Sequence, residues 1–130
     1  MLKDSHAFSG FSVDDLAVAK KFYGETLGLK VEDGPMDNLQ LEVAGGNPIF
    51  IYEKSDHKPA TFTILNFPVD DIDKVVDELK AKDVSFEVYD NMPAAQDEKG
   101  VLRGLAAHQG PDIAWLKDPA GNILSILQDK

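Results

Sequence analysis

Polar and apolar positions along the chain alternate with two different periods, and the order of these periods predicts the secondary structure. A period of two residues is typical of a strand with one buried face, and a period near 3.6 is typical of an amphipathic helix. In the first half, the pattern predicts strands near 8–13, 29–32, 38–43 and 49–53, with a helix after the first strand. The apolar stripe of this helix stops at Gly28, a residue type that favours helix ends.

The second half repeats this order of elements. Its pattern predicts strands near 61–69, 85–89, 112–116 and 123–128, with a helical stripe that begins at Ile72. Each half is therefore predicted to be a β-α-β-β-β module.

A polar segment, 90–109, is inserted before the third strand of the second half. It contains Pro93, Gly100 and Gly104 and shows no regular apolar period. Long loops inside a compact domain usually form a lid or contact a partner, or else they are disordered. We therefore expect the insertion to form a lid, to contact a partner, or to be disordered.

Two matches within the sequence indicate an internal repeat. Residues 11–16, FSVDDL, resemble residues 67–72, FPVDDI, and a glycine–asparagine turn before a short apolar strand occurs near 45–51 and again near 119–126. Repeats of this kind indicate that one structural unit occurs twice.

The repeat defines the expected fold class. One domain spanning 1–130 would contain a first module at about 5–54 and a second at about 60–129. Each sheet must cover one face with its helix while its other face stays open. The predicted class is α+β, with two βαβββ modules forming a curved mixed sheet around a cleft.

Composition and charge restrict the functions open to the chain. It has 130 residues and no cysteine, which excludes a disulfide framework, a thiolate metal site and a cysteine nucleophile. The 13 basic and 23 acidic side chains give a net charge of −10, which repels nucleic acid and anionic membranes. No apolar stretch approaches the roughly 20 residues of a membrane span, and no signal peptide is recognisable, so we expect a cytoplasmic protein.

Three motifs occur in the order and spacing of a known family. They are FSVDDL at 11–16, FYGETLGL at 22–29 and DPAGNIL at 118–124. Together with the repeat, they resemble the vicinal oxygen chelate superfamily, which includes glyoxalases, extradiol dioxygenases, fosfomycin-resistance transferases and bleomycin-resistance proteins. The resemblance covers essentially the whole chain and implies the paired βαβββ fold. It implies no single activity, because this fold hosts several kinds of enzyme as well as binding proteins.

The resemblance also implies where a divalent metal would be held. Enzymes of the family use a His or Glu from the first and last strand of each module. Here those positions carry Phe8 and Ile64 in the first strands and Phe50 and Ser125 in the last strands. Only the serine has a donor oxygen, and a neutral hydroxyl is a poor ligand for a divalent cation. We therefore expect no metal and no cofactor, and we assign no catalytic residue.

Aromatic and apolar side chains occupy the strand faces where the metal ligands would lie. Residues i and i+2 of a strand share a face, so Tyr52 accompanies Phe50 and Phe62 accompanies Ile64. We interpret this face as an aromatic cleft that stacks a planar ligand, with a few polar groups that orient it. The alternative is that these side chains only fill the cavity. The predicted ligand-binding residues are Phe8, Gln40, Glu42, Phe50, Tyr52, Phe62, Ile64, Asn66, Arg103, Trp115 and Ser125.

Other polar residues have both a functional and a structural interpretation. His6, His57 and His108 are candidates for an unusual metal site, although isolated histidines in turns and at strand ends are usually solvated. The aspartate pairs at 14–15 and 70–71 precede the predicted helices and are explained as N-caps.

Arg103 is a cation in the insertion, between Gly100 and Gly104. One interpretation is that it anchors a carboxylate of the ligand. The other is that it pairs with one of the neighbouring acids, Asp97 or Glu98.

Three functions from different classes follow. The first is a metal-free binding protein, similar to bleomycin-resistance proteins, that sequesters a small planar, neutral or cationic molecule such as a drug or antibiotic. The second is an enzyme of the same family, a lyase, isomerase, transferase or dioxygenase-like protein, that works without metal or with unusual ligands such as His6, Glu42 and His108. The third is an interaction domain whose cleft is filled by its own side chains. A pocket beside the aromatic residues would favour the binding protein over the interaction domain.

We also expect a homodimer. Two βαβββ modules leave strand edges and apolar rims that a two-fold partner can cover. By resemblance, a dimer of the bleomycin-resistance type would complete the clefts. The sequence is compatible with modules that pair within one chain and with modules exchanged between chains.

Overall fold

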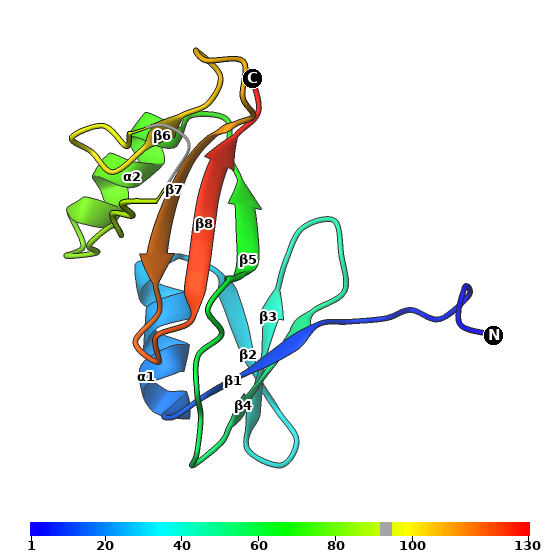
Figure 1. The fold of residues 1–130 in the computed structure, drawn as a ribbon. Coiled ribbons are helices and arrows are strands. Elements are labelled where there is room, and N and C mark those ends of the chain that lie inside the picture. The colour runs from blue at the N-terminus through cyan, green and yellow to red at the C-terminus, as the bar shows by residue number, and fades with distance from the viewer. Residues whose placement is uncertain (92–94) are drawn as a thin grey trace. The chain divides into compact units, whose positions relative to one another are not determined.

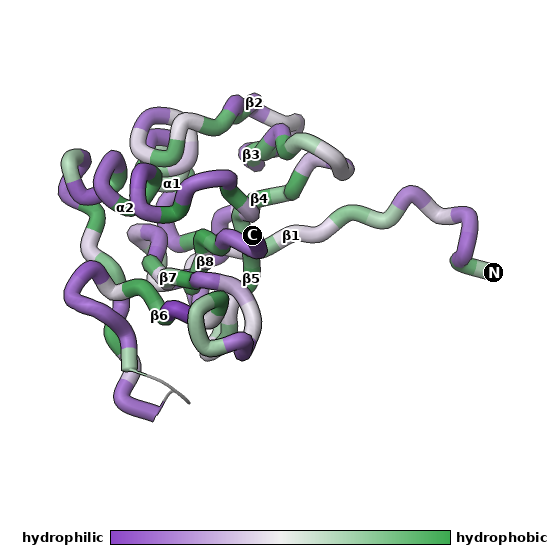
Figure 2. Tube along the Cα trace, turned by 90° about the horizontal axis from the view of Figure 1, so that it is seen from above, coloured by the Kyte–Doolittle hydropathy of each residue, from purple (hydrophilic) through white to green (hydrophobic). Residues whose placement is uncertain are grey.

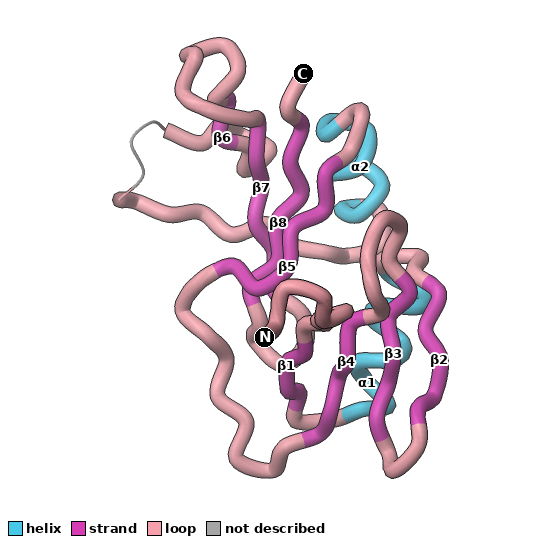
Figure 3. The backbone as a smooth tube through the Cα atoms, turned by 90° about the vertical axis from the view of Figure 1, so that its right-hand side faces the viewer, coloured by secondary structure: helices cyan, strands magenta, loops and turns pink. Residues whose placement is uncertain are grey.

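Two four-stranded sheets, one in each half of the chain, form the framework of the computed structural model, which describes residues 1–91 and 95–130. The chain divides into two units, Met1–Pro59 (unit 1) and Ala60–Lys130 (unit 2). Each unit has the element order βαβββ, and its helix packs on one face of its sheet (Figure 1 and Figure 3). The predicted α+β class with two βαβββ modules is therefore confirmed.

Unit 1 is a mixed sheet with a short helix packed on one face. Its spatial strand order is β1-β4-β3-β2, with β1 parallel to β4 and the other pairs antiparallel. The elements are β1 (Gly10–Val13), α1 (Leu16–Lys21), η1 (Phe22–Thr26), β2 (Lys30–Gly34), β3 (Asn38–Glu42) and β4 (Ile49–Glu53).

The first helix changes its winding before it ends. The sequence predicts one α-helix up to Gly28, but from Phe22 the chain forms a π-helical turn, in which the Leu27 N–H donates to the Phe22 carbonyl at 2.9 Å. The wider turn accompanies the full burial of Tyr23, whose ring packs 5.9 Å from that of Phe11. Gly28 then ends the helix with a φ of 74°, as its position in the sequence predicts.

Unit 2 has the same topology with a longer connection after its helix. Its spatial strand order is β5-β8-β7-β6, with β5 parallel to β8 and the other pairs antiparallel. The elements are β5 (Thr63–Pro68), α2 (Ile72–Lys80), β6 (Leu102–Arg103), β7 (Asp112–Lys117) and β8 (Ile123–Gln128).

The predicted strand at 85–89 is wrong. That segment makes one isolated bridge, between Phe86 and Leu116, and the strand that pairs with the outer edge of β7 is β6, which lies inside the insertion predicted to be a loop. The side chain of Gln96 replaces the missing ladder, because it bonds to the backbone of Glu87, Tyr89 and Gly100. Pro93, another residue of this insertion, lies outside the described residues.

Strand alternation gives each sheet one face that packs on its helix. In unit 1 this face carries buried side chains such as Leu41 and Ile51, and in unit 2 it carries Leu116 and Leu124. Hydrophobic and hydrophilic residues alternate along the turns of α2 (Figure 2), and its buried residues Ile72, Val76 and Leu79 recur at helical spacing. Within each described unit, the opposite face of the sheet is not covered by the helix of that unit.

The helix starts are built alike in the two units. Asp15 and Asp71, the second members of the two aspartate pairs, accept hydrogen bonds from Val18 N and Lys74 N at 3.1 Å, which confirms that these two are N-caps. Each helix start also has a second acceptor, supplied by the last strand of the unit, which was not predicted from the sequence. Glu53 Oε1 accepts from Leu16 N at 3.0 Å, and Gln128 Oε1 accepts from Ile72 N at 2.9 Å.

Removing one of these strand-borne acceptors tests its contribution. Glu53→Ala is expected to lower the free energy of unfolding by about 1 kcal/mol, because Leu16 N loses its partner at the positive end of the helix dipole. Glu53→Gln keeps an acceptor of the kind found at Gln128 and is expected to stay within about 0.5 kcal/mol of the wild type. Urea unfolding measures both. Equal losses in the two variants would contradict the capping role.

Candidate functional site

The helix-free face of the unit 1 sheet carries several of the predicted ligand-binding residues. Strand register makes Gln40 and Phe50 direct neighbours across β3 and β4, and it places Tyr52 between Asn38 and Ser12. The rings of Phe50 and Tyr52 stack, with centroids 5.5 Å apart and planes inclined by 23°. The structure therefore brings together the aromatic pair and the central amide that alternation placed on one face.

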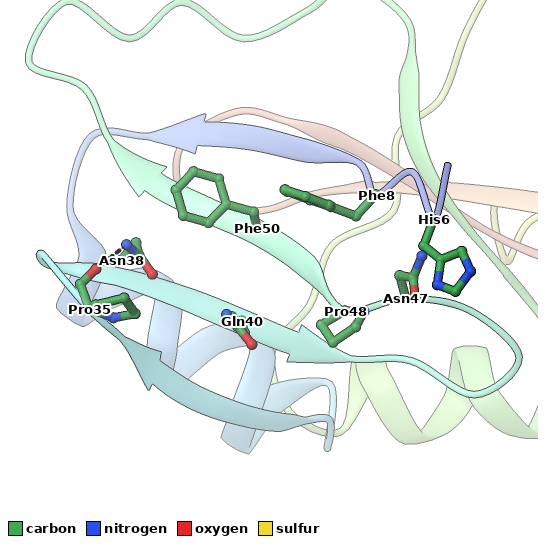
Figure 4. Close-up of a pocket in the computed structure, with 8 residues that line it drawn as sticks. All are labelled: His6, Phe8, Pro35, Asn38, Gln40, Asn47, Pro48 and Phe50. Carbon is green, nitrogen blue, oxygen red and sulfur yellow. Dashed lines mark hydrogen bonds between the residues drawn. The ribbon is translucent and has the colours of Figure 1, made fainter. Parts of the chain in front are cut away.

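A cavity of about 390 Å³ opens on this face (Figure 4). Three of its lining residues, Phe8, Gln40 and Phe50, were predicted from the sequence, and five were not. Alternation along β3 would have added Asn38, which lies two residues before Gln40. His6 lies two residues before Phe8 and so shares its period, whereas the other three lie in connections between strands, where no periodic pattern signals them. The lining residues are His6, Phe8, Pro35, Asn38, Gln40, Asn47, Pro48 and Phe50.

One wall of the cavity is the segment that precedes β1. The sequence predicts a strand from residue 8, but β1 begins at Gly10, so Phe8 lies outside the strand and its residue surface is 66% exposed. Two hydrogen bonds hold the segment to the rest of unit 1. Asn47 Nδ2 donates to the Ala7 carbonyl at 2.8 Å, and Phe50 N donates to the Ser9 carbonyl at 3.0 Å. These bonds place His6 and Phe8 beside the sheet.

Two further predicted residues, Glu42 and Tyr52, share the open face but do not line the cavity. Glu42 is the cross-strand partner of Lys30 at the β2–β3 pair, and Lys30 forms an ion pair of 3.2 Å with Glu32. Tyr52 borders the cavity through its stacked neighbour Phe50.

In unit 2, three predicted residues form a row across the open face. Asn66 pairs with Ser125, and Ser125 pairs with Trp115, so all three side chains share one face. The Ser125 hydroxyl donates to Asn66 Oδ1, and Ser125 is fully buried. Tyr89, which was not predicted, packs its ring edge on Trp115 with centroids 5.5 Å apart.

Two further predicted residues of this unit, Phe62 and Ile64, lie where the strand is irregular. Thr63 pairs with Ile123 and Leu65 pairs with Leu124, so Ile64 is an extra residue in a β-bulge. Simple alternation, on which the prediction for Phe62 and Ile64 relied, does not hold across a bulge. Phe62 precedes β5 and is 67% exposed.

Arg103 pairs with carboxylates of its own unit. Its guanidinium bonds to both oxygens of Asp73, at 3.0 and 2.8 Å, and its Nε donates to Asp97 at 2.9 Å. The hydrogen bonds from Arg103 and then Lys99 hold the pKa of Asp73 well below its usual range. Of the two interpretations of Arg103, the structure shows the ion pair with Asp97, and it adds Asp73, which the sequence did not indicate.

The three histidines have separate environments. His6 lines the cavity, whereas His57 Nδ1 lies 2.6 Å from the hydroxyl of Ser12, a serine–histidine pair that the sequence analysis missed. His108 lies in the insertion of unit 2 with a φ of 54°. Among residues 1–91 and 95–130, no three His, Asp or Glu side chains are grouped to hold a metal ion.

The residues at the metal positions of the family do not fit a divalent cation. In unit 1 these positions are Phe8 and Phe50, which have no donor atom. In unit 2 they are Ile64 and Ser125, and the Ser125 hydroxyl is engaged with Asn66. Divalent cations require carboxylate, imidazole or several oxygen ligands.

A family model matches residues 6–126, which is nearly the whole chain. The chain belongs to the Glyoxalase/Bleomycin resistance protein/Dioxygenase superfamily. This agrees with the resemblance carried by the three sequence motifs. Curated protein sequences give no match to the chain.

Solved structures of the same fold include proteins with different named activities. An antibiotic binding protein, TnmS3 from Streptomyces sp. CB03234, is 23% identical with a TM-score of 0.66, over 95% of this chain and 96% of that one. A glyoxalase/dioxygenase from Nostoc punctiforme is 16% identical with a TM-score of 0.70, over 99% and 92%. The fosfomycin resistance protein FosX from Listeria monocytogenes is 14% identical with a TM-score of 0.68, over 95% and 92%. These likenesses establish the fold.

No helix in the described part of the chain has the length and apolar character to cross a membrane.

Proposed function

We propose that this chain is a metal-free binding protein for a small planar molecule, neutral or cationic, and that the cavity of unit 1 is its binding site. The observation that carries the proposal is the cavity itself, about 390 Å³ in volume and flanked by Phe8 and Phe50. Its size falls within the range of about 300 to 1,000 Å³ typical of small-molecule sites. Aromatic walls next to a few polar groups are the usual lining of such sites.

The exposure of the aromatic residues supports this proposal over a core that fills itself. Phe8 is 66% exposed and Tyr52 is 38% exposed, so neither ring is packed into the interior. Exposed aromatic groups beside a hollow are characteristic of a binding surface. The named antibiotic binding by TnmS3 is a precedent on the same fold.

Fluorescence titration with three planar probes of different charge tests the proposal. The probes are neutral 1-aminoanthracene, cationic proflavine and anionic 8-anilinonaphthalene-1-sulfonate. The net charge of −10 is expected to disfavour the anion, so the first two probes should bind more tightly than the third. Tightest binding of the anion, or no binding of any probe, would contradict the proposal.

Phe8, one of the two phenylalanines that line the cavity, is tested with a matched control variant outside the cavity. Phe8→Ala is expected to weaken binding of 1-aminoanthracene about tenfold, because one aromatic wall is lost. Val88→Ala removes a similarly exposed apolar side chain, 71% against 66%, that does not line the cavity, and it should leave the affinity within about twofold. Both variants should keep the wild-type melting temperature. Equal weakening by the two variants would show that the unit 1 cavity alone is not the site.

A second candidate, an enzyme of the same family, has one specific observation in its favour. The 2.6 Å contact between Ser12 and His57 has the geometry of a nucleophile and its base. An acyl-transfer enzyme would attack a reactive phosphonate through Ser12 Oγ, release fluoride and pass the proton to His57. Mass spectrometry after incubation with a fluorophosphonate distinguishes the two: the binding proposal expects an unmodified chain, and a covalent adduct on Ser12 would favour the enzyme.

A homodimer and a cytoplasmic location belong to the same proposal. The proposed partners are a small molecule and a second copy of the chain. Nucleic acid is not among them, because the net charge of the chain is −10. Light scattering of the full chain measures the dimer directly, and a monomer at micromolar concentration would remove that part of the proposal.

A further inference from the structure

The lining of the unit 1 cavity contains no Asp, Glu, Lys or Arg side chain. Asp, Glu, Lys and Arg make up 28% of the chain, yet none of the eight lining residues is one of them. The lining instead consists of two phenylalanines, two prolines, one histidine and the carboxamides of Asn38, Gln40 and Asn47. A carboxamide both donates and accepts hydrogen bonds, so the polar part of this cavity can recognise both functions in a ligand.

The three carboxamides differ in what they already bond. Asn38 Nδ2 donates to the Pro35 carbonyl, and Asn47 Nδ2 donates to the Ala7 carbonyl at 2.8 Å. Gln40 makes no side-chain hydrogen bond within residues 1–91 and 95–130, so its donor and its acceptor are both available to a ligand. Asn38 Oδ1 is buried and also has no hydrogen-bond partner, so Gln40 is the residue of the three whose donor and acceptor are both unused.

The position of Gln40 is central in the cavity. It lies on β3 between Pro35 and Asn38 at one end and Pro48 at the other (Figure 4). Its cross-strand neighbour on β4 is Phe50, so a ring that lies along Phe50 would present an edge toward the Gln40 amide. Ring and amide together define a flat site with one polar edge.

The charges outside the cavity do not complete a site for an ion. On β2, Glu32 is the cross-strand partner of Gln40, and it forms an ion pair of 3.2 Å with Lys30. Glu42 lies two residues beyond Gln40 and does not line the cavity. A charged ligand would therefore lose hydration in the cavity without gaining an opposite charge from Asp, Glu, Lys or Arg at its wall. The free energy lost with this hydration exceeds the free energy gained from neutral hydrogen bonds.

We propose that this cavity selects a neutral planar heterocycle with an N–H and a C=O side by side on one edge, as in a lactam or imide. The Gln40 carboxamide accepts from the N–H and donates to the C=O, while the ring lies against Phe8 and Phe50. Paired bonds of this kind are how glutamine and asparagine recognise the edge of a planar base. The inference rests on the proposed function and narrows its ligand class from neutral or cationic to neutral.

Three ligands built on one ring system test the selection. They are 2-quinolinone, which has the full edge, 1-methyl-2-quinolinone, which lacks the N–H, and the cation 1-methylquinolinium. Titration of the ¹⁵N-labelled full chain is followed by NMR, with the side-chain amide signals of Gln40 identified by their loss in Gln40→Met. We expect 2-quinolinone to bind about tenfold more tightly than either of the others and to shift the Gln40 amide signals.

A variant separates the hydrogen bonds from the shape of the ligand. Gln40→Met keeps the length of the side chain and removes both polar functions, so the preference for 2-quinolinone over its N-methyl derivative should fall to about twofold or less. Gln109→Met makes the same change at an exposed residue of unit 2 and should keep the tenfold preference.

The outcomes distinguish this inference from the proposed function. If all three ligands bind equally and Phe8→Ala weakens them all, the binding function stands and selection by Gln40 is wrong. If the cation binds most tightly, the neutral class is wrong while the binding function stands. If no ligand binds, both proposals fail for this cavity. A preference that survives in Gln40→Met would overturn the role of the carboxamide.

Discussion

Replacement of Asp118 by alanine is expected to lower the free energy of unfolding by about 3 kcal/mol, the largest loss we expect from a single polar substitution in this chain. Asp118 is 4% exposed and lies in the turn between β7 and β8. Its Oδ1 accepts from the backbone N–H groups of Ala120 and Asn122, and its Oδ2 accepts from the Asn122 side chain, each at 2.9 Å. Alanine would leave these donors without their partner in a buried turn.

Two controls separate the loss of hydrogen bonds from a general sensitivity to substitution. Asp118→Asn keeps one acceptor oxygen and is expected to lose about 1 kcal/mol, because only the bond from Asn122 Nδ2 is broken. Asp129→Ala removes an exposed carboxylate from the chain end and should change stability by less than about 0.5 kcal/mol. Urea unfolding followed by the fluorescence of Trp115, the single tryptophan, reports on the neighbouring strand. A loss below about 1 kcal/mol in Asp118→Ala would contradict the role of this turn.

Features that depend on local sequence were predicted well. The strands at 49–53 and 123–128 have the predicted bounds, because strong apolar runs between turn residues leave little choice of register. Gly28 and the capping aspartates Asp15 and Asp71 act where the sequence places them, since their roles depend on φ and on amides three residues away.

The strand predicted at 85–89 shows where local pattern is insufficient. Its alternation is compatible with a strand, but the edge of β7 pairs with Phe86 at one point and with β6 beyond it. The side chain of Gln96 bonds to the backbone of Glu87 and Tyr89 across several residues of irregular backbone. No period in the sequence encodes such contacts.

The cavity was predicted only in part for a related reason. Asn47 and Asn122 occupy equivalent positions in the internal repeat, 75 residues apart, but they have different partners. In unit 2, Asp118 binds Asn122 within the turn, whereas in unit 1 the equivalent of Asp118 is Val43, and Asn47 bonds to Ala7 instead. This difference places His6 and Phe8 at the cavity wall. It follows from a contact across 40 residues, which the pattern of one strand does not reveal.

Replacement of Arg103 by methionine is expected to lower the free energy of unfolding by about 2 kcal/mol at pH 7, because Asp73 loses a bidentate partner and Asp97 loses the Nε donor. This loss in the free energy of unfolding is smaller than for a buried pair, because the Arg103 and Asp73 side chains are 34% and 47% exposed. Lys20→Met is a matched control, because it breaks an ion pair of 3.0 Å with Asp33 whose members are more exposed. We expect that control to lose less than about 0.5 kcal/mol.

Acid should reveal the same cluster in the wild type. Hydrogen bonds from Arg103 and Lys99 lower the pKa of Asp73. Burial acts to raise the pKa of Asp97, but the bonds from Val101 N–H and Arg103 outweigh it, so that pKa is also lowered. Because both pKa values are lower in the folded chain, the stabilisation is complete above the unfolded value of about 3.9 and is lost as the pH falls below it. Urea unfolding from pH 6 down to pH 2.5 should therefore show a steeper loss of stability in the wild type than in Arg103→Met. Parallel curves for the two proteins would show that Arg103 does not hold these carboxylates in solution.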